Sequence, residues 1–303
     1  MHSSLPPTIG FLPRSQQQLL TELIQKIVGA VRPEKIICYG IRSVHYQDWG
    51  VFLETGGIKE GARLAIDLLI IAPSTKGQTE QDISQAAEYC CKHLADVCCV
   101  THKIHTVNEG LTNGNPFFCA LYRHGLMIYN SGQTALLHPV FPENEFISQS
   151  ELEGIWSRWY GLASNFYNSA VESLKYQRPD LTTFMLHQAV EHTCGALIRI
   201  YTGYRPNTHN LSRLLQMAES FTRELKAIFP KSTKEEEEIY GILQRGYLDA
   251  RYKDEYNVPA STLQILIYRV QQFQKVAADL YMGKMSQHLQ PLFNRIPDSP
   301  AFP

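Results

Sequence analysis

The sequence has almost no net charge. Its 28 lysine and arginine residues are balanced by 29 aspartate and glutamate residues, which gives a formal charge of −1. Divided at residue 145, the first part carries 11 basic and 13 acidic residues, and the remainder carries 17 and 16. Neither part is a polycation, so the charge alone gives no support for a broad electrostatic attraction to nucleic acid. The charge count is still compatible with a local basic patch.

Long apolar runs are missing as well. No stretch reaches the ~18 apolar residues that a membrane span requires. The first residues, MHSSLPPTIGFLPRSQQQ, have no apolar segment behind a basic start, which a secretory signal would show. We therefore expect a cytoplasmic protein that has no membrane partner.

The cysteines lack the spacing of a disulfide framework. There are seven, an odd number, and the only dense group is CCKHLADVCC, from Cys90 to Cys99. Cys98 and Cys99 are neighbours on an apparent strand and must point to opposite faces, which does not suit a tetrahedral zinc site. The sequence predicts buried free thiols here and no metal site.

The first part of the chain alternates between helical and strand-like segments. Apolar residues at helical spacing indicate helices over 17–30 and 80–95, and a further helix followed by a short strand fits within 116–132. Short apolar runs predict strands over 34–40, 49–57, 63–71 and 97–107. This alternation predicts an α/β domain with a small mixed sheet over residues 1–135.

Beyond a proline-containing linker at 136–149, the apolar period changes to 3.6 residues and stays there. The predicted helices begin at residue 150 and then cover 181–201, 210–228, 234–252 and 261–284. The sequence thus predicts a second, all-α domain of five helices over residues 150–285, followed by a C-terminal tail, 286–303.

Two segments of the first domain resemble minimal nucleotidyltransferases. IICYGIRS (36–43) is similar to the first motif of that family, where a glycine and a serine after a strand cradle nucleotide phosphates. LAIDLLII (64–71) is similar to the second, in which two aspartates hold magnesium. The resemblance implies a nucleotidyltransferase-like fold and a nucleotide site made by four residues: Gly40, Arg42, Ser43 and Asp67.

The same segments depart from the family at positions that matter for metal binding. Ile41 stands where the serine belongs, Ala65 replaces the first aspartate, and the strand at 97–107 offers no third acid. Mg²⁺ prefers several carboxylates, so we predict no cofactor and at most weak Mg²⁺ binding. Asp67 then either hydrogen-bonds a backbone N–H or pairs with Arg42 or Arg63, or it keeps a residual nucleotide-binding role.

The second domain resembles HEPN domains, which are helical modules named for nucleotide binding. The matching segments are FMLHQAVEHTCGALIRIYTGYRPNTHNLSRLLQMA (184–218) and RGYLDARYKDEY (245–256). The resemblance implies a homodimer that binds a nucleotide or RNA and regulates a partner, including a protein partner of the toxin–antitoxin type.

Many HEPN domains are metal-independent ribonucleases whose motif is an arginine followed by a histidine after four to six residues. Counted from Arg251, the three positions that this motif allows for the histidine hold Tyr256, Asn257 and Val258. Counted from Arg245, they hold Ala250, Arg251 and Tyr252, so neither arginine is followed by a histidine at the required distance. We therefore expect a non-catalytic binding protein. The alternatives are a ribonuclease that uses His209 with Arg251, and a weak nucleotidyltransferase.

The candidate ligand contacts of the second domain are charged or aromatic residues near these segments. They are His187, Glu191, His209, Arg245, Arg251, Tyr252 and Tyr256. Arginines offer a planar fork for phosphate, tyrosines offer a stacking face, and His187 and Glu191 share a helix face at i, i+4.

Four of these residues also have a structural alternative. Arg251 could pair with Asp249, Asp254 or Glu255 in a solvated loop, and the His187–Glu191 pair could only fix helix packing. His209 could orient the start of the next helix, where Asn210 is a good N-cap. Arg245 and Arg251 meet only if the helix frays at 249–252.

Overall fold

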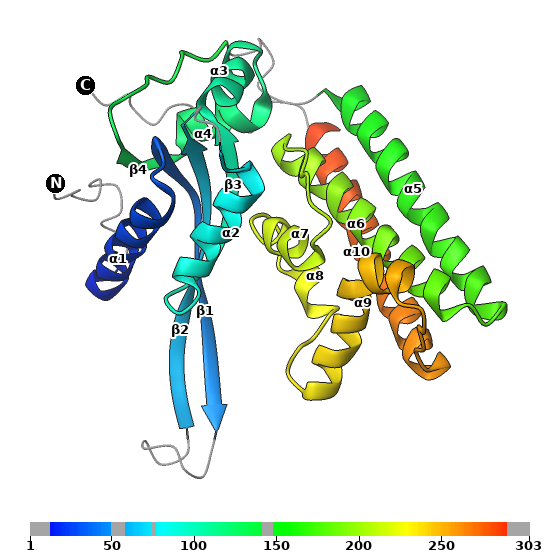
Figure 1. Ribbon diagram of the computed structural model, residues 1–303. Coiled ribbons are helices and arrows are strands. Elements are labelled where there is room, and N and C mark those ends of the chain that lie inside the picture. Colours follow the sequence, from blue (N-terminus) through cyan, green and yellow to red (C-terminus); the bar gives the residue numbers. More distant parts are fainter. Residues whose placement is uncertain (1–12, 50–57, 74–76, 141–147, 290–303) are drawn as a thin grey trace. The chain divides into compact units, whose positions relative to one another are not determined.

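We describe a computed structural model that covers residues 13–49, 58–73, 77–140 and 148–289, with the side chains of 43–49, 58–63 and 287–289 outside the described set. The chain divides into two compact units, residues 1–145 and 146–303, and each is described by itself (Figure 1). None of the helices in these ranges is both long enough and apolar enough to cross a membrane.

The first unit contains a four-stranded mixed sheet (Figure 1). Its strands are β1 (Lys35–Trp49), β2 (Ile58–Ala72), β3 (Asp96–Lys103) and β4 (Leu126–Asn130), in the order β3-β2-β1-β4. β2 runs parallel to β3, and β1 is antiparallel to both β2 and β4. The predicted mixed sheet is therefore confirmed.

The helices of this unit are α1 (Arg14–Val31), α2 (Glu80–Cys91), α3 (Ile104–Thr112) and α4 (Pro116–His124). α1 and α2 share one buried core with one face of the sheet, to which alternate strand residues such as Ile66, Leu68 and Ile70 contribute. Phe117 and Phe118 of α4 contact Tyr39 of β1 and His102 of β3. Because strand side chains alternate between faces, Asp67 belongs to the face opposite Ile66 and Leu68.

The predicted ends of two strands in the first unit, 34–40 and 97–107, were wrong. β1 is one strand of 15 residues, whereas the sequence suggested a strand that ends at Gly40. The separate strand predicted for 49–57 falls mostly outside the described residues. The strand predicted for 97–107 ends at Lys103, because Ile104, Val107 and Leu111 have helical spacing and are buried on one side of α3.

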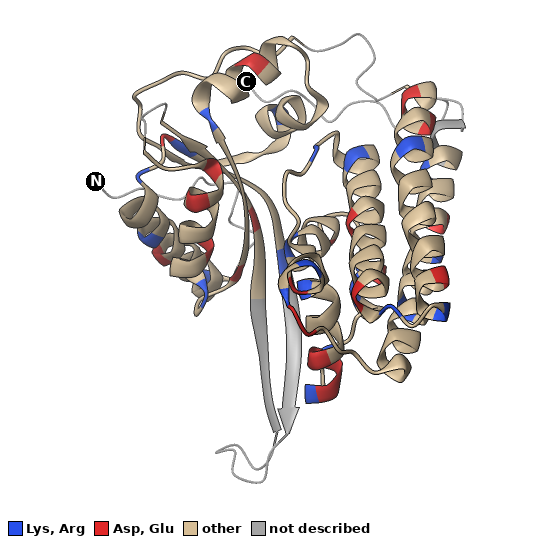
Figure 2. Cartoon of the chain, turned by 45° about the vertical axis from the view of Figure 1, so that its right-hand side comes forward, with Lys and Arg blue, Asp and Glu red and all other residues tan. Residues whose placement is uncertain are grey.

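The second unit is helical. Its elements are α5 (Gln149–Lys175), α6 (Pro179–Thr202), α7 (Leu211–Ala218), α8 (Glu224–Ala227), α9 (Lys234–Tyr252) and α10 (Ala260–Leu289). α6 is buried on most sides because it packs against α5, α7, α9 and α10. Acidic side chains occupy the first turn of α9 (Figure 2), where they interact favourably with the helix dipole.

The helix predicted for 210–228 is interrupted in the structure. α7 ends at Ala218, and only the short α8 follows it. In the intervening turn the Ser220 hydroxyl donates to the carbonyl of Met217, and the Thr222 hydroxyl accepts from the N–H of Glu224. Such side-chain bonds compete with the helical hydrogen bonds of the backbone. The other four predicted helices are present.

Candidate functional site

In the first unit, Asp67 lies in the middle of the sheet and is fully buried. Arg42, on the neighbouring strand, pairs with it through two contacts: Nη1 meets Oδ2, and Nη2 donates to Oδ1 at 2.9 Å. A two-pronged contact of this kind is the strongest form of arginine–carboxylate pair. Of the roles considered for Asp67, the structure shows the ion pair with Arg42.

Gly40 provides the space for this pair. It lies opposite Asp67 at a register shift in β1, and a Cβ atom at Gly40 would come within 2.3 Å of Oδ2 of Asp67. The glycine is therefore required for the packing of the carboxylate, whatever else it does. Ser43 continues β1 opposite Leu64, and its side chain lies outside the described set.

The second motif, LAIDLLII, suggested magnesium binding, but this unit offers few ligands for a metal ion. Ala65 is buried opposite Arg42 in the strand register, so no second carboxylate accompanies Asp67 from that position. Cys98 and Cys99 are both buried in β3, and neither belongs to a disulfide. Across the described ranges, no group of three histidine, cysteine or acidic side chains is placed to hold a metal ion.

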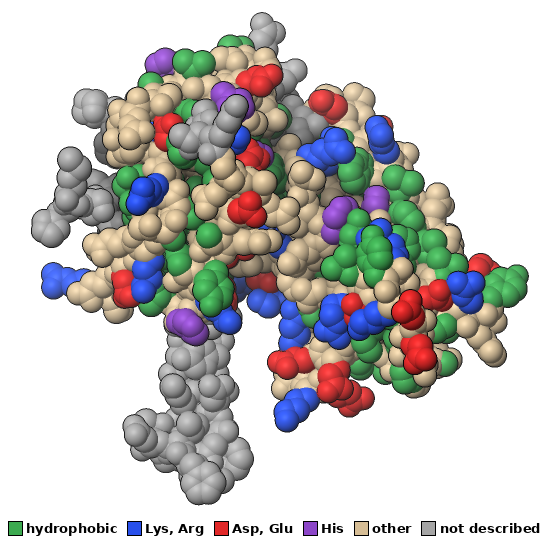
Figure 3. Space-filling view, in the orientation of Figure 1, with side chains coloured by type: hydrophobic (Ala, Val, Ile, Leu, Met, Phe, Trp, Pro, Cys, Tyr) green, Lys and Arg blue, Asp and Glu red, His purple; other side chains and the backbone are tan. Residues whose placement is uncertain are grey.

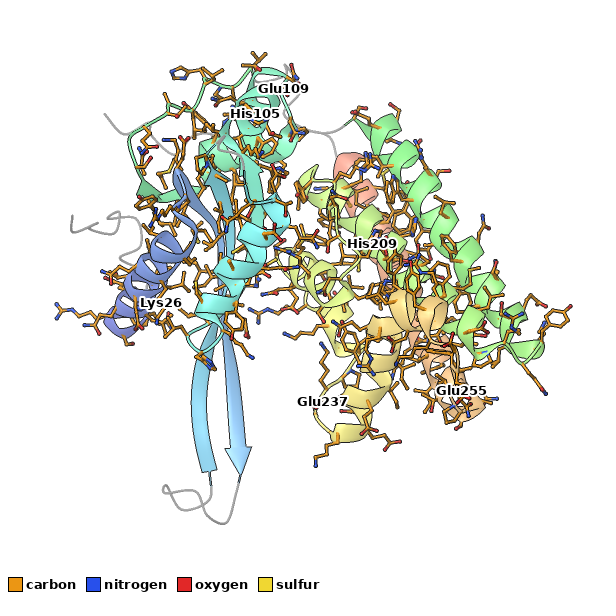
Figure 4. The ribbon with its side chains drawn as sticks, in the orientation of Figure 1. Lys26, His105, Glu109, His209, Glu237 and Glu255 are labelled. Atoms are coloured by element: carbon orange, nitrogen blue, oxygen red, sulfur yellow. The ribbon has the colours of Figure 1, made fainter. Side chains whose placement is uncertain are left out.

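In the second unit, residues from three segments meet around Tyr247 of α9. We call His187, Glu191, His209, Tyr247 and Arg251 the Tyr247 cluster. The first two come from α6, the third from the loop before α7, and the last two from α9. Figure 4 labels His209 beside α6, and Figure 3 shows histidine side chains next to hydrophobic and basic ones on the surface of this unit.

His187 is the buried end of the cluster. It is fully inaccessible, and its Nδ1 lies 3.0 Å from the carbonyl oxygen of Leu243 in α9. A carbonyl can only accept, so Nδ1 carries the proton and Nε2 faces Glu191. Nε2 is 3.5 Å from Oε2 of Glu191, which is an ion-pair distance and too long for a strong hydrogen bond. His187 therefore ties α6 to α9, as the packing alternative predicted.

Glu191 is held from two further directions. Nδ1 of His209 lies 3.0 and 3.1 Å from its two carboxylate oxygens, and Nε2 of Gln188 donates to Oε2 at 3.1 Å. Burial by itself raises the pKa of Glu191, but the two histidines lower it by more, so the pKa falls below its ordinary value. The carboxylate is thus kept ionised and fixes the orientation of His209.

His209 and Arg251 both contact the ring of Tyr247. The imidazole stacks on the tyrosine ring with centroids 4.4 Å apart and an interplanar angle of 9°. The guanidinium carbon of Arg251 is 4.0 Å from the same ring centroid, and Nε donates to the carbonyl of Tyr247 at 2.7 Å. Both His209 and Arg251 are exposed, so this part of the cluster can meet a ligand.

Tyr247 was not among the residues predicted from the sequence. It precedes Arg251 by four residues, so the two share a face of α9. That spacing was a usable signal, since an aromatic ring one turn before an arginine is well placed to support the guanidinium. The meeting of Tyr247 with His209 has no signal in the sequence, because the two lie on different elements.

The fraying of α9 that would let Arg245 meet Arg251 does not occur, so the two arginines lie on different faces of the helix. The helix continues to Tyr252, and Nε of Arg245 lies 3.4 Å from Asp249, which also pairs with Lys253 at 2.8 Å. The structure shows no pairing of Arg251 with Asp249. Its contacts are the aromatic rings and one backbone carbonyl.

The other two predicted tyrosines differ from each other. Tyr252 is 72% exposed, and its ring centroid lies 5.0 Å from the guanidinium carbon of Arg251, so it borders the cluster. Tyr256 is half-buried, and burial raises its pKa although a hydrogen bond with Thr183 opposes this.

Asn210 caps α7 as predicted, since its side-chain oxygen accepts from the N–H of Arg213 at 3.2 Å.

Comparison with known protein families identifies a HEPN domain at residues 156–279. The match includes every residue of the Tyr247 cluster and does not reach the first unit. The HEPN resemblance of the second unit is thereby confirmed, whereas the nucleotidyltransferase-like resemblance of the first unit stays a prediction. None of the curated proteins matches the chain.

Proposed function

We propose that the HEPN domain binds a nucleotide or RNA at the Tyr247 cluster, without catalysis, and so regulates a partner. The observation that carries the proposal is the placement of Arg251. Its guanidinium group is exposed and supported by an aromatic ring, and among the described residues no carboxylate pairs with it. An arginine held in this way offers its remaining N–H groups to a phosphate.

The aromatic rings around Arg251 are suited to bind the base of a nucleotide whose phosphate contacts the arginine. Tyr252 is largely exposed and lies beside the guanidinium, so it can stack on a base. Glu191 is engaged by His209 and Gln188, which limits its repulsion of an incoming phosphate. The phosphate therefore meets Arg251 first, and His209 lies on the same ring as a second contact.

Metal-independent RNA cleavage is a second candidate, and it is favoured by the contact between His209 and Glu191. Because Nδ1 of His209 donates to Glu191, a neutral imidazole keeps the lone pair on Nε2. Nε2 can take the proton of a ribose 2′-OH, whose oxygen attacks phosphorus as the bond to the 5′-oxygen breaks. The products are a 2′,3′-cyclic phosphate and a 5′-hydroxyl that takes its proton from water, and Arg251 stabilises the phosphate charge.

Two measurements separate the candidates. A panel of nucleotides and short RNAs in a thermal-shift assay, with and without Mg²⁺, detects binding, since a ligand at 100 times its Kd adds ~2.7 kcal/mol of stability. Incubation of labelled RNA with the protein in excess chelator detects cleavage. Binding without cleavage supports the first candidate, and cleavage that His209→Ala abolishes supports the second. A protein that does neither refutes both.

The nucleotide site predicted for the first unit has weaker support. Arg42 and Asp67 engage each other inside the sheet, and this pairing leaves the carboxylate poorly disposed to hold Mg²⁺. We therefore assign the ligand to the HEPN domain. Weak nucleotidyl transfer by Gly40, Arg42, Ser43 and Asp67 is a further candidate that the assay with Mg²⁺ also tests.

We also propose a homodimer and a protein partner of the toxin–antitoxin type, both on the strength of the HEPN match. The Trp156 ring of α5 is stacked within its own unit, between Tyr160 and Tyr281, with ring centroids 4.1 and 4.3 Å away. Light scattering at micromolar concentration should report twice the chain mass, and a monomer would contradict the proposal.

A further inference from the structure

A second group of basic residues surrounds Trp159 in the HEPN domain. Arg158 and Trp159 belong to α5, Arg199 to the last turn of α6, and Arg205 to the loop between α6 and α7. The guanidinium carbons of Arg199 and Arg205 lie 5.1 and 5.5 Å from the centroid of the Trp159 ring. We call these four residues the Trp159 cluster.

The positive charge of the Trp159 cluster is not balanced by acids. Within the described part of the chain, no salt bridge joins its three arginines to a carboxylate. Burial lowers the pKa of Arg199, and the charges of Arg205 and Arg158 lower it further. An arginine cannot lose its proton in a protein, so the mutual repulsion persists until an anion neutralises it.

The Trp159 ring, over which Arg199 and Arg205 lie, is fixed in position by its packing against α6. A Cβ atom on Gly195 of α6 would lie 3.4 Å from the ring, and the ring centroid is 5.6 Å from that of His192. His192 is fixed in turn by its Nδ1, which lies 3.0 Å from the carbonyl oxygen of Gln188. The arrangement joins a planar ring to several guanidinium groups, as single-stranded nucleic acid sites do.

The Trp159 cluster and the Tyr247 cluster are joined by short segments. Arg205 and His209 belong to the same loop, and four residues span at most about 14 Å. On α6, Glu191 contacts His209, and the next residue, His192, contacts Trp159. A strand of a few nucleotides is therefore long enough to contact both clusters.

We propose that Arg158, Arg199 and Arg205 bind backbone phosphates of a single RNA strand whose other contacts are made by the Tyr247 cluster. This inference rests on the proposed function and narrows its ligand to a strand of several nucleotides. RNA is favoured over an acidic protein because guanidinium forks fit phosphate oxygens and because the exposed Tyr252 ring, which borders the Tyr247 cluster, gives a base a stacking surface.

The test compares AMP with an RNA of about eight nucleotides, a common length for a single-strand site. Arg205→Gln and Arg199→Gln should each weaken RNA binding about tenfold, the loss expected for one charge-assisted contact. The slope of log K against log salt should fall by about 0.7 for each phosphate that a variant no longer neutralises. The affinity for AMP should not change.

Arg223→Gln is the matched control, because it removes an exposed arginine that precedes α8. Arg205 is an exposed loop residue, so its variant stays folded even if Arg199→Gln does not, and thermal melting checks both. The proposal is overturned if Arg205→Gln binds RNA as Arg223→Gln does, or if AMP binding falls equally. It is also overturned if the variants lose affinity for oligoglutamate and keep it for RNA.

Arg251→Ala separates this proposal from the proposed function. If both hold, Arg251→Ala weakens AMP and RNA alike, whereas Arg205→Gln weakens RNA alone. If Arg251→Ala changes neither affinity and Arg205→Gln still weakens RNA, the Tyr247 cluster is refuted as the ligand site and the Trp159 cluster is supported as an RNA contact.

Discussion

Replacement of Arg251 by alanine is the most direct test of the Tyr247 cluster. The side chain is exposed at the end of α9, where Nε is bonded to the carbonyl of Tyr247 and the guanidinium lies over the tyrosine ring. These contacts hold the group in one orientation before a ligand arrives. The alanine variant removes the phosphate contact and leaves Tyr247 and His209 in place.

The expected loss can be estimated from the type of contact. A hydrogen bond to a charged group contributes ~1.5–3 kcal/mol, so Arg251→Ala should weaken binding by roughly tenfold to a hundredfold. The cost to folding is smaller, because an exposed cation–π contact contributes ~0.5–1 kcal/mol. The domain should therefore remain folded while its affinity falls.

Two further variants define the role of Arg251. Arg251→Lys should recover only part of the affinity, because an ammonium group lacks the planar fork and cannot repeat the Nε bond. Arg245→Ala removes the same charge from the same helix, but Arg245 already pairs with Asp249. We expect this variant to bind within about twofold of the wild type, in line with the small energies of exposed ion pairs.

Titration of labelled RNA and of AMP into the four proteins measures these differences, with circular dichroism as the folding control. The expected order of affinity is wild type, Arg245→Ala, Arg251→Lys and Arg251→Ala. Equal affinities for the wild type and both Arg251 variants would refute the assignment of Arg251 to the ligand site. A larger loss for Arg245→Ala than for Arg251→Ala would place the phosphate elsewhere on α9.

Three more outcomes concern the Arg42–Asp67 pair, Glu191 and Ala65. Arg42→Ala leaves the buried charge of Asp67 without its arginine and should cost about 3–5 kcal/mol in urea unfolding of the first unit; a loss under about 1 kcal/mol would contradict this. Because the pKa of Glu191 lies below its ordinary 4.5, its ionised form stabilises the fold above about pH 4.5, and this stability is lost as the pH falls through the lower folded pKa. The difference in unfolding free energy between wild type and Glu191→Gln should therefore shrink below about pH 4.5. A constant difference down to about pH 3 would show that the ionised carboxylate of Glu191 does not stabilise the fold. Ala65→Asp should not create tight Mg²⁺ binding or nucleotidyl transfer, measured by calorimetry and by incorporation of labelled nucleotide, because Asp67 stays paired with Arg42.

The sequence was sufficient for most of the helical domain. The helix predicted for 234–252 is α9 with the same bounds, because its apolar period and the Thr233 cap are local features. Asn210 was likewise recognisable as a cap. The lengths of β1 and β2 were not predictable in this way, since the pairing of two distant segments determines where a strand ends.

For the candidate sites, the sequence supplied residues and the tertiary structure supplied their partners. Helical spacing was enough to pair His187 with Glu191, and the HEPN resemblance was enough to single out Arg251. The sequence left three possible partners for Asp67. The strand register decided between them, because it places Gly40 opposite Asp67, and the missing Cβ of the glycine leaves space for the carboxylate to pair with Arg42. His209 and Tyr247 lie on different elements, and only the packing of α6 against α7 and α9 brings their rings to 4.4 Å. Local periodicity contains no information about such contacts, because they depend on how whole helices fit together.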